Sequence, residues 1–346
     1  MKSVEERCLW WCRICSGIVI RNIRASLNKV LLTSIDVPIC SPLSVTSSSL
    51  PKSVHRIALV RWLVLVCSLF CFNTIQASPL KVALALSEER EVYLAFESAL
   101  RNSLDSRQEI QILPSGTAAQ AELIVAIGAK AADSFSGSSI PVLNVMVSRA
   151  GLEKFRRDSH SESSGIYMDQ PMERRFSLLR AALPQTKSVG VLISNTSPQL
   201  ASAKQLSSAS GFRLQIQTVS TPDQLASSLS ALLADSDVFL VLPDAEIYRS
   251  DTIRNILLET YRQQVPMIGL SQNYVRAGAL CAVYSTPMQI ADQAARIVSQ
   301  FARTRKLPDY QYPQEFEVAV NTQVARSLGL TILSAEQLRN EIGERP

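Results

Sequence analysis

The sequence predicts an α/β protein made of two doubly wound, Rossmann-like lobes that are joined by a hinge and separated by a cleft. From residue 80 onward, short runs rich in Val, Ile and Leu alternate with amphipathic segments. This alternation is typical of parallel strands that are buried on both faces and connected by helices. Roughly ten such runs exceed one comfortable sheet, so two lobes with chain crossings between them are the economical arrangement.

The first series of apolar runs predicts the first lobe. Strands are expected over residues 81–86, 109–113, 122–127 and 141–147, and helices over 88–104 and 129–135. Pro114 and Gly116 stop the second strand, because proline cannot donate to a ladder and glycine favours a turn. We expect residues 78–165, together with about 285–310, to form this lobe.

The second series predicts the second lobe. Helices are expected over residues 172–183, 198–210, 222–234, 248–264 and 322–328, and strands over 188–193, 213–219, 237–242, 265–269, 280–284 and 316–320. A further helix, expected over 287–303, falls in the stretch assigned to the first lobe. Thr221 is the expected N-cap of the helix that starts at Pro222. We expect this lobe to comprise residues 166–284 and about 311–332, with a C-terminal tail or helix over 333–346.

Three segments are the expected crossings between the lobes. Residues 163–171 contain a glycine and end in a proline, and residues 304–313 (TRKLPDYQYP) are polar and proline-bearing. A third crossing is expected near residues 284–287. In doubly wound folds the ligand binds beyond the carboxyl ends of the strands, so we expect the ligand site in the cleft between the lobes.

The chain before Ser78 differs from the rest. A basic flank leads into the apolar run 62–72 (WLVLVCSLFCF), and small or aliphatic residues precede a cut after Ala77. These are the three parts of a secretory signal peptide, which we assign to residues 54–77. The predicted location is therefore periplasmic or secreted; an uncleaved N-terminal anchor is the alternative. Residues 1–53 are expected to be a disordered or non-native extension, with translation starting near Val54.

Composition argues against several classes of function. Residues 1–77 hold nine Lys/Arg and three acidic residues, which leaves 78–346 nearly neutral and gives no basic patch for nucleic acid. Cys281 is the one cysteine after the cut; we expect it to be buried and inert in a strand.

The sequence also offers little for catalytic or metal chemistry. His160 lies in a polar loop, so neither a catalytic triad nor a zinc site is expected, nor any cofactor or other metal. Cys8, Cys12 and Cys15 have the spacing of an iron–sulfur site, but they precede an export signal, and we interpret the match as chance.

Several motifs in the second series resemble one protein family. They are residues 265–280 (VPMIGLSQNYVRAGAL), then Tyr284, residues 293–295 (QAA), residues 316–330 (FEVAVNTQVARSLGL) and residues 174–192 (RRFSLLRAALPQTKSVGVL). As an ordered set these resemble the ABC-transporter substrate-binding family of the TrpX-like kind, which has the type I periplasmic-binding-protein fold. The first series departs from it, because residues 87–93 (SEEREVY) stand where the family has His-Pro and Leu-Asp.

The candidate ligand contacts follow strand ends, where free N–H groups at helix starts favour anionic groups. In the second lobe they are Ser194, Asn195, Asp244, Ser271, Gln272 and Tyr274; in the first lobe they are Ser87, Gly128 and Ser148. Asp244 could pair with a ligand ammonium group, and Tyr274 could offer a flat apolar wall. For Ser194, Asn195 and Asp244, capping of the following helix is the structural alternative. Tyr284 is expected to be a crossing residue rather than a contact.

The resemblance implies a solute-binding protein rather than an enzyme. We expect a monomer that closes on a small, amino-acid-like ligand and presents it to an ABC permease in the inner membrane. Two alternatives stay open. The same fold could serve as the ligand-binding partner of a membrane sensor, or the protein could be a periplasmic enzyme acting on a small metabolite.

Overall fold

The computed structural model describes residues 78–343, except 106, 159–161 and the stretch 198–210 apart from 199 and 205. Residues 76–346 form one compact unit. The predictions for the N-terminal extension, the signal peptide, the cysteine motif, His160 and most of the helix over 198–210 lie outside the described residues.

The first sheet has five parallel strands in the order β2-β1-β3-β4-β5. The strands are β1 (Leu80–Leu86), β2 (Ile110–Ile112), β3 (Leu123–Ile127), β4 (Val142–Val147) and β5 (Ser163–Tyr167), and the helices are α3 (Glu91–Asp105), α4 (Ala129–Ser134) and α5 (Arg149–Asp158). A short 3-10 turn, η1, spans Ala118–Gln120. Every residue of β3 and β4 is buried, as expected for strands covered on both faces.

Residues 163–171 were expected to form a crossing between the lobes. That expectation is wrong for residues 163–167, which form strand β5. Its first residues, Ser163, Ser164 and Gly165, have low strand propensity, which hid the strand in the sequence. Gly165 fits because a Cβ there would lie 2.8 Å from a Leu152 side-chain carbon and 3.0 Å from the carbonyl oxygen of Asn144. The strand therefore needs a residue without a side chain at its tightest point.

The second sheet has six strands in the order β11-β10-β9-β8-β6-β7. Its strands are β6 (Ser188–Ser194), β7 (Arg213–Val219), β8 (Val238–Leu240), β9 (Met267–Gly269), β10 (Cys281–Tyr284) and β11 (Glu317–Val320). Its helices are α6 (Met172–Ala182), α8 (Leu225–Ala234), α9 (Ile253–Arg262), α10 (Gln272–Ala277), α12 (Thr322–Ser327) and α13 (Ala335–Gly343). All neighbours are parallel except β11, which pairs antiparallel with β10.

Two helix boundaries of the second sheet differ from expectation. Helix α9 begins at Ile253 rather than at Tyr248, because residues before it form a loop that buries the Tyr248 ring against the sheet. Thr221 precedes the 3-10 turn η2 (Pro222–Gln224) in extended conformation, but its side chain makes no capping hydrogen bond. Helix α10 was not expected, since its six residues are too short to show a period.

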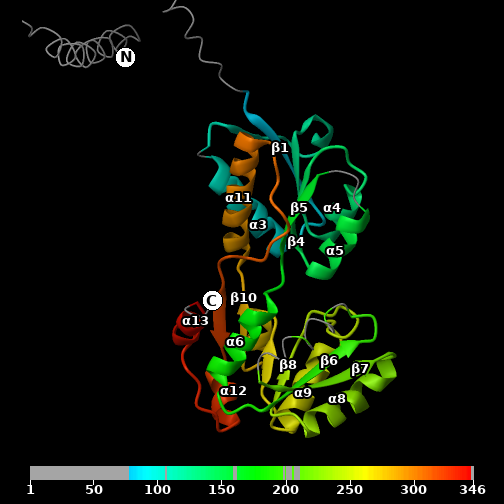
Figure 1. Cartoon of the computed structure of the whole chain (residues 1–346), viewed down its shortest axis with the longest axis vertical. Helices are drawn as coiled ribbons and strands as arrows, with labels where there is room; N and C mark the ends of the chain where they lie inside the picture. Colours follow the sequence, from blue (N-terminus) through cyan, green and yellow to red (C-terminus); the bar gives the residue numbers. More distant parts are fainter. Residues whose placement is uncertain are drawn as a thin grey trace, which may run out of the picture. The chain divides into compact units, whose positions relative to one another are not determined.

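Helix α11 (Pro287–Thr304) follows a strand of the second sheet but packs against the core of the first. Figure 1 shows it beside α3. A capping box starts it: the Thr286 hydroxyl accepts from the Gln289 N–H at 3.2 Å, and the Gln289 side chain accepts from the Thr286 N–H at 2.9 Å. The buried positions Ile290, Ala294 and Val298 form the face that covers the first sheet.

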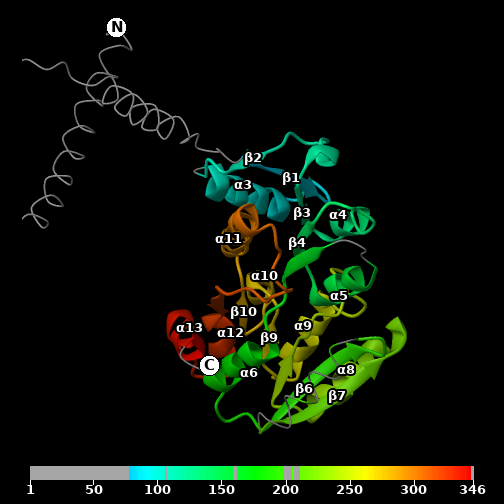
Figure 2. The same cartoon turned by 45° about the horizontal axis from the view of Figure 1, so that its top comes forward.

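Within the part of the chain that the structure describes, three segments pass between the two sheets (Figure 2). The passages are residues 168–171 between β5 and α6, residues 285–286 between β10 and α11, and residues 312–316 before β11. Just before the third passage, the chain runs along the edge of the first sheet, where Gln311 forms a parallel bridge with Ile166. None of the helices among the described residues combines the length and the hydropathy that a membrane span requires.

Candidate functional site

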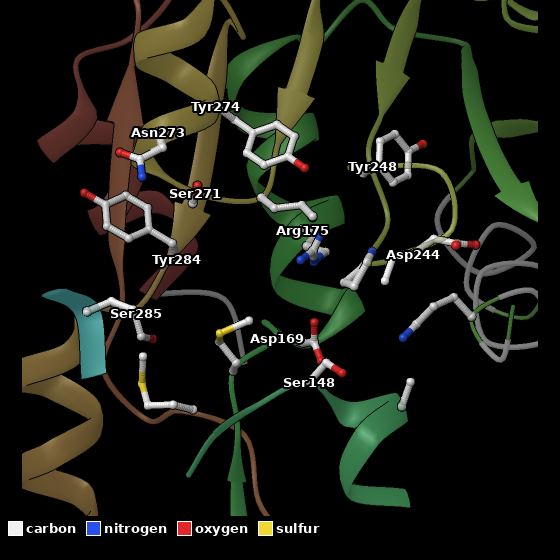
Figure 3. Close-up of a pocket in the computed structure, with 18 of the residues that line it drawn as sticks. Ser148, Asp169, Arg175, Asp244, Tyr248, Ser271, Asn273, Tyr274, Tyr284 and Ser285 are labelled. Carbon is white, nitrogen blue, oxygen red and sulfur yellow. The ribbon is translucent and has the colours of Figure 1, made fainter. Parts of the chain in front are cut away.

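A cavity of about 720 Å³ lies where the two sheets face each other. Residues that follow the carboxyl ends of β4, β8 and β9, together with the last residues of β6 and β10, line it; examples are Ser148, Asp244, Ser271, Ser194 and Tyr284. Figure 3 shows the side chains of Ser148, Asp244, Ser271 and Tyr284 converging from both sides. This is the position at which doubly wound folds bind their ligands.

One wall is a polar cluster around Asp244. Its Oδ2 accepts from the backbone N–H and the hydroxyl of Ser194, both at 2.8 Å, and its Oδ1 accepts from the N–H of Glu246 at 3.1 Å. The Thr196 hydroxyl donates to the Glu246 carboxylate at 2.9 Å. The Asp244 carboxylate thus ties the loops after β6 and β8 together while it faces the cavity.

A second wall is aromatic and consists of Tyr248, Tyr274 and Tyr284. Burial raises the pKa of each phenol, and for Tyr248 the pKa lies well above its ordinary value. The hydroxyls therefore stay protonated at neutral pH, and that of Tyr248 donates to the Leu192 carbonyl oxygen at 2.7 Å. Gly269 lets Tyr274 pack closely, since a Cβ there would lie 2.5 Å from the Tyr274 Cβ.

Arg175 of α6 reaches the cavity from the centre of the second-sheet side (Figure 3). The residue is 3% exposed, and its Nη1 donates to the Val241 carbonyl oxygen at 3.0 Å. Burial lowers the pKa of its guanidinium, and the Asp169 carboxylate partly offsets that effect. It is the one Lys or Arg among the residues that line the cavity in the described part of the chain.

Asp169 lies on the opposite side, in the first passage between the sheets. It is 8% exposed, and its Oδ2 accepts from the Arg149 N–H at the start of α5. Burial raises the pKa of its carboxyl group. Its neighbour Ser148 accepts from the Gly151 N–H through its hydroxyl at 3.3 Å.

Apolar side chains of Met146 and Met168 complete the first-sheet side. Met146 has φ of 58°, in the left-handed region that a residue with a side chain rarely adopts, and β4 has an irregular register beside it. Such local strain persists only where the surrounding fold imposes it, and it is common next to ligand sites.

The structure brings most of the predicted site residues together. Those that line the cavity are Ser148, Ser194, Asp244, Ser271, Gln272 and Tyr274. Asn195 is exposed and lies outside the lining.

Ser87 and Gly128 also lie outside the lining and contact each other instead. The Ser87 hydroxyl accepts from the Ala131 N–H at 2.9 Å in the first turn of α4, so this helix end is already capped. Gly128 has φ of 90°, and a Cβ at this position would lie 2.5 Å from the Ser87 hydroxyl oxygen. These two residues therefore support the fold next to β1 and β3.

Sequence reasoning missed Arg175 and Asp169 and placed Tyr284 among crossing residues. A signal for Arg175 existed: Met172, Arg175, Phe176 and Leu179 have the i, i+3, i+4, i+7 spacing of a buried helix face, and all four are buried. An arginine on such a face needs a partner in the interior.

The site has no grouping suited to metal chemistry among the described residues, where no cluster of three His, Cys, Asp or Glu side chains occurs. Cys281 is buried, as expected, and burial raises the pKa of its thiol to about 12. The thiol is therefore protonated at neutral pH and a poor nucleophile.

Comparison with known proteins places the chain in a family. The profile of the family described as ABC transporter substrate binding protein matches residues 86–341, and the chain belongs to this family. Among curated protein sequences none matches.

Solved structures share the fold. A conserved domain protein from Vibrio cholerae has 20% identity and a TM-score of 0.55, with 76% of this chain and 98% of that chain covered. A domain from Streptococcus pneumoniae in complex with L-Trp has 17% identity and a TM-score of 0.55, with the same coverage. A substrate-binding protein with adhesive properties from Clostridium difficile, in a ligand-free, open structure, has 16% identity and a TM-score of 0.59, with 74% and 97% covered. The fold is that of type I periplasmic binding proteins, as the sequence predicted.

Proposed function

We propose that this protein is the extracytoplasmic solute-binding component of an ABC importer. It binds a small, amino-acid-like molecule in the cavity and delivers it unaltered to a permease in the inner membrane. It acts as a monomer, and residues 54–77 direct its export as a cleaved signal peptide. Residues Ser148, Ser194, Asp244, Ser271, Gln272 and Tyr274 contact the ligand, together with Arg175, Asp169 and Tyr284.

The observation that carries this proposal is the placement of the cavity. Its lining comes from both sheets, while the described part of the chain passes between the sheets three times. Two bodies joined by such short passages can rotate about them and close on a molecule. Closure responds to a ligand only if the ligand binds the closed form more tightly, which a cavity with walls on both bodies allows.

The amino-acid-like character of the ligand is suggested by the charges of the cavity. A buried guanidinium and a buried carboxylate face it, beside a wall of tyrosines. The Streptococcus pneumoniae domain of the same fold binds L-Trp. Transport, rather than catalysis, is favoured because the family is that of ABC transporter substrate binding proteins.

The test begins with the natural ligand. The full chain is expressed in a bacterium, the purified protein is denatured, and the released small molecule is identified by mass spectrometry. Binding is then measured by calorimetry and by thermal stability, since a ligand at 100 times its Kd stabilises by about 2.7 kcal/mol. We expect one molecule per chain, released unchanged.

Two results would redirect the proposal. Conversion of the released molecule into a product on incubation would indicate an enzyme. Uptake of labelled ligand that is unaffected by deletion of the gene would separate binding from import and favour a sensory role. Loss of uptake in the deletion strain, restored by the gene in trans, supports the importer.

A further inference from the structure

We propose that Arg175 and Asp169 form the recognition pair of this cavity: Arg175 binds a carboxylate of the ligand, and Asp169 binds a protonated amine on the same molecule. The inference rests on the proposed function and deepens it. It names the ligand class as a zwitterion with an adjacent acid and amine on an apolar or aromatic body.

The first observation is the state of Arg175. Its guanidinium carries five N–H donors, and the hydrogen bond it makes within the described residues uses one nitrogen, toward Val241. No ion pair joins it to any carboxylate of the described residues. Burial lowers the pKa of this guanidinium, and the Asp169 carboxylate, which lies beyond ion-pair distance, offsets that effect only in part. An anionic group entering the cavity would remove more of the cost of burying this cation.

The geometry of a guanidinium favours a carboxylate as this anion. Its planar fork can donate two parallel hydrogen bonds to the two oxygens of one carboxylate, with better specificity than a point charge. Arg175 is also the one positive side chain in the described lining, so it is the only place there that such a group can be neutralised.

The second observation is the position of Asp169 across the cavity. In Figure 3 its carboxylate points toward Arg175 from the opposite side, next to Ser148. One of its oxygens accepts from the Arg149 N–H, and no cationic side chain of the described residues lies within ion-pair distance of this carboxylate. A simple carboxylate bound to Arg175 would therefore face a second negative charge, whereas a neighbouring ammonium group would pair with it.

The other acids of the cavity are less suited to the amine. Asp244 already accepts from the Ser194 N–H, the Ser194 hydroxyl and the Glu246 N–H. Glu246 accepts from Thr196 and is exposed to water. Asp169, with 8% exposure, offers the least screened charge.

The rest of the lining suits an uncharged body. Tyr274 and Tyr284 on one side and Met146 and Met168 on the other give aromatic and flexible apolar surfaces. Methionine side chains adapt to different shapes and contact aromatic rings favourably. A volume of about 720 Å³ accommodates an amino acid with a large side chain.

The experiment uses protein purified from expression of the full chain and measures Kd by calorimetry. The probes are the twenty standard amino acids, the methyl ester and the N-acetyl derivative of each one that binds, and D-ribose and myo-inositol as uncharged solutes. The variants are Arg175→Met and Asp169→Asn, which remove one charge each with little change in volume. The controls are Arg303→Met and Asp309→Asn, which remove exposed charges outside the cavity.

We expect a free amino acid to bind, and its ester and its N-acetyl derivative to bind at least about 30-fold more weakly, as for a buried charge pair that loses one partner. The Arg175→Met variant should bind the free amino acid about 30-fold more weakly than the wild type, and its Kd should be the same for the free acid and the methyl ester. The Kd of the Asp169→Asn variant should be the same for the free amino acid and its N-acetyl derivative. The two control variants should keep the wild-type Kd.

The comparison between two ligands is made on one and the same variant. It therefore tests the roles of Arg175 and Asp169 even if the variant is less stable than the wild type. Equal affinity of wild-type protein for an amino acid and its ester would overturn the role of Arg175. Binding of D-ribose or myo-inositol without binding of any amino acid would overturn the inference and leave the proposed function standing. Failure of every amino acid to bind would also overturn it, while the molecule released on denaturation decides the proposed function separately.

Discussion

The side-chain amide of Gln170 donates a hydrogen bond of 2.8 Å to the hydroxyl of Ser285. This hydroxyl in turn donates to the Glu315 carbonyl oxygen at 2.5 Å. Arg174 donates through Nη1 to the Gln170 side-chain oxygen at 2.6 Å and to the Pro313 carbonyl oxygen at 3.1 Å. One network thus joins all three passages between the sheets, next to the cavity.

Removal of the central hydroxyl should weaken this network. Ser285→Ala leaves the Gln170 amide, in a residue 4% exposed, without an acceptor, and we expect the free energy of unfolding to fall by about 1 kcal/mol. Urea denaturation measures it. A double-mutant cycle with Gln170→Ala should show a coupling of at least about 0.5 kcal/mol, because the two side chains share one bond.

Ser327→Ala is the matched control for Ser285→Ala. Its exposed hydroxyl bonds only to the Val324 carbonyl oxygen of its own helix, at 2.9 Å, so little change is expected. Additive effects of the Gln170 and Ser285 substitutions would show that the passages are not coupled through this bond.

Gly269→Ala should damage the aromatic wall. The new Cβ would lie 2.5 Å from the Tyr274 Cβ and 3.3 Å from the Ala279 Cβ, both in tightly packed positions. We expect a loss of about 1–3 kcal/mol in the free energy of unfolding, as for overpacked cores, and weaker binding of the ligand. Thermal denaturation and calorimetry measure the two effects.

Gly137→Ala provides the comparison for Gly269→Ala. Gly137 is exposed, and no atom lies within 4 Å of its Cβ position. Because alanine also restricts the unfolded chain, this variant should be as stable as the wild type or slightly more stable. If both glycine variants behaved alike, close packing against Tyr274 would not be the cause.

The strands were predictable because burial on both faces demands continuous apolar runs, and Leu123–Ile127 is such a run. Strand β5 was not predicted because it begins with two serines and Gly165, which have low strand propensity, and the glycine is needed where the fold leaves no room for a Cβ. Residues at strand ends, such as Ser194 and Ser271, were predictable as residues lining the cavity, because the topology brings strand ends together.

Arg175 and Asp169 could not be found by the same rule. Arg175 lies on a helix and Asp169 in a passage between the sheets, so their approach depends on how the passages direct the chain. Ser87 and Gly128 follow strand ends in the first sheet, yet they cap and support α4. A position at a strand end therefore identifies a candidate site residue. The packing around it decides whether the residue caps a helix or lines the cavity.

Cys281 should react with alkylating reagents only in unfolded protein. Burial raises the pKa of its thiol to about 12 from an ordinary value of 9.0. The sign follows from linkage: the unfolded thiol loses its proton first, so the contribution of Cys281 to stability is full below about pH 9 and is lost as pH rises toward 12. Peptide mapping after iodoacetamide treatment should show labelling of Cys281 in denaturant but not in native protein.

The same linkage predicts a pH signature. The free energy of unfolding of the wild type should fall more steeply above pH 9 than that of Cys281→Ala. Parallel pH profiles for the two proteins, or labelling of Cys281 in the native state, would show that the thiol is accessible.

Asp169→Asn should make the ligand-free protein more stable while it weakens binding. Burial raises the pKa of the Asp169 carboxyl above its ordinary 3.8, so its ionisation at neutral pH is unfavourable in the folded state. For an acid with a raised pKa in the folded state, the contribution to stability is full below the unfolded pKa and is lost as pH rises through the folded pKa. Asparagine stays neutral and can still accept from the Arg149 N–H, so the variant should be more stable at pH 7 by about 1 kcal/mol.

The pH profile separates this cause from a general effect of the substitution. The gain in unfolding free energy should shrink as the pH falls through the raised pKa of Asp169, because the wild-type carboxyl group then becomes protonated and neutral as well. A saturating amino acid should reverse the order at pH 7, because only the wild-type carboxylate pairs with the ammonium group. A ligand-free variant that is less stable than the wild type at pH 7 would instead mean that Arg175 already balances the charge of Asp169, and that the ligand has to displace this attraction rather than supply it.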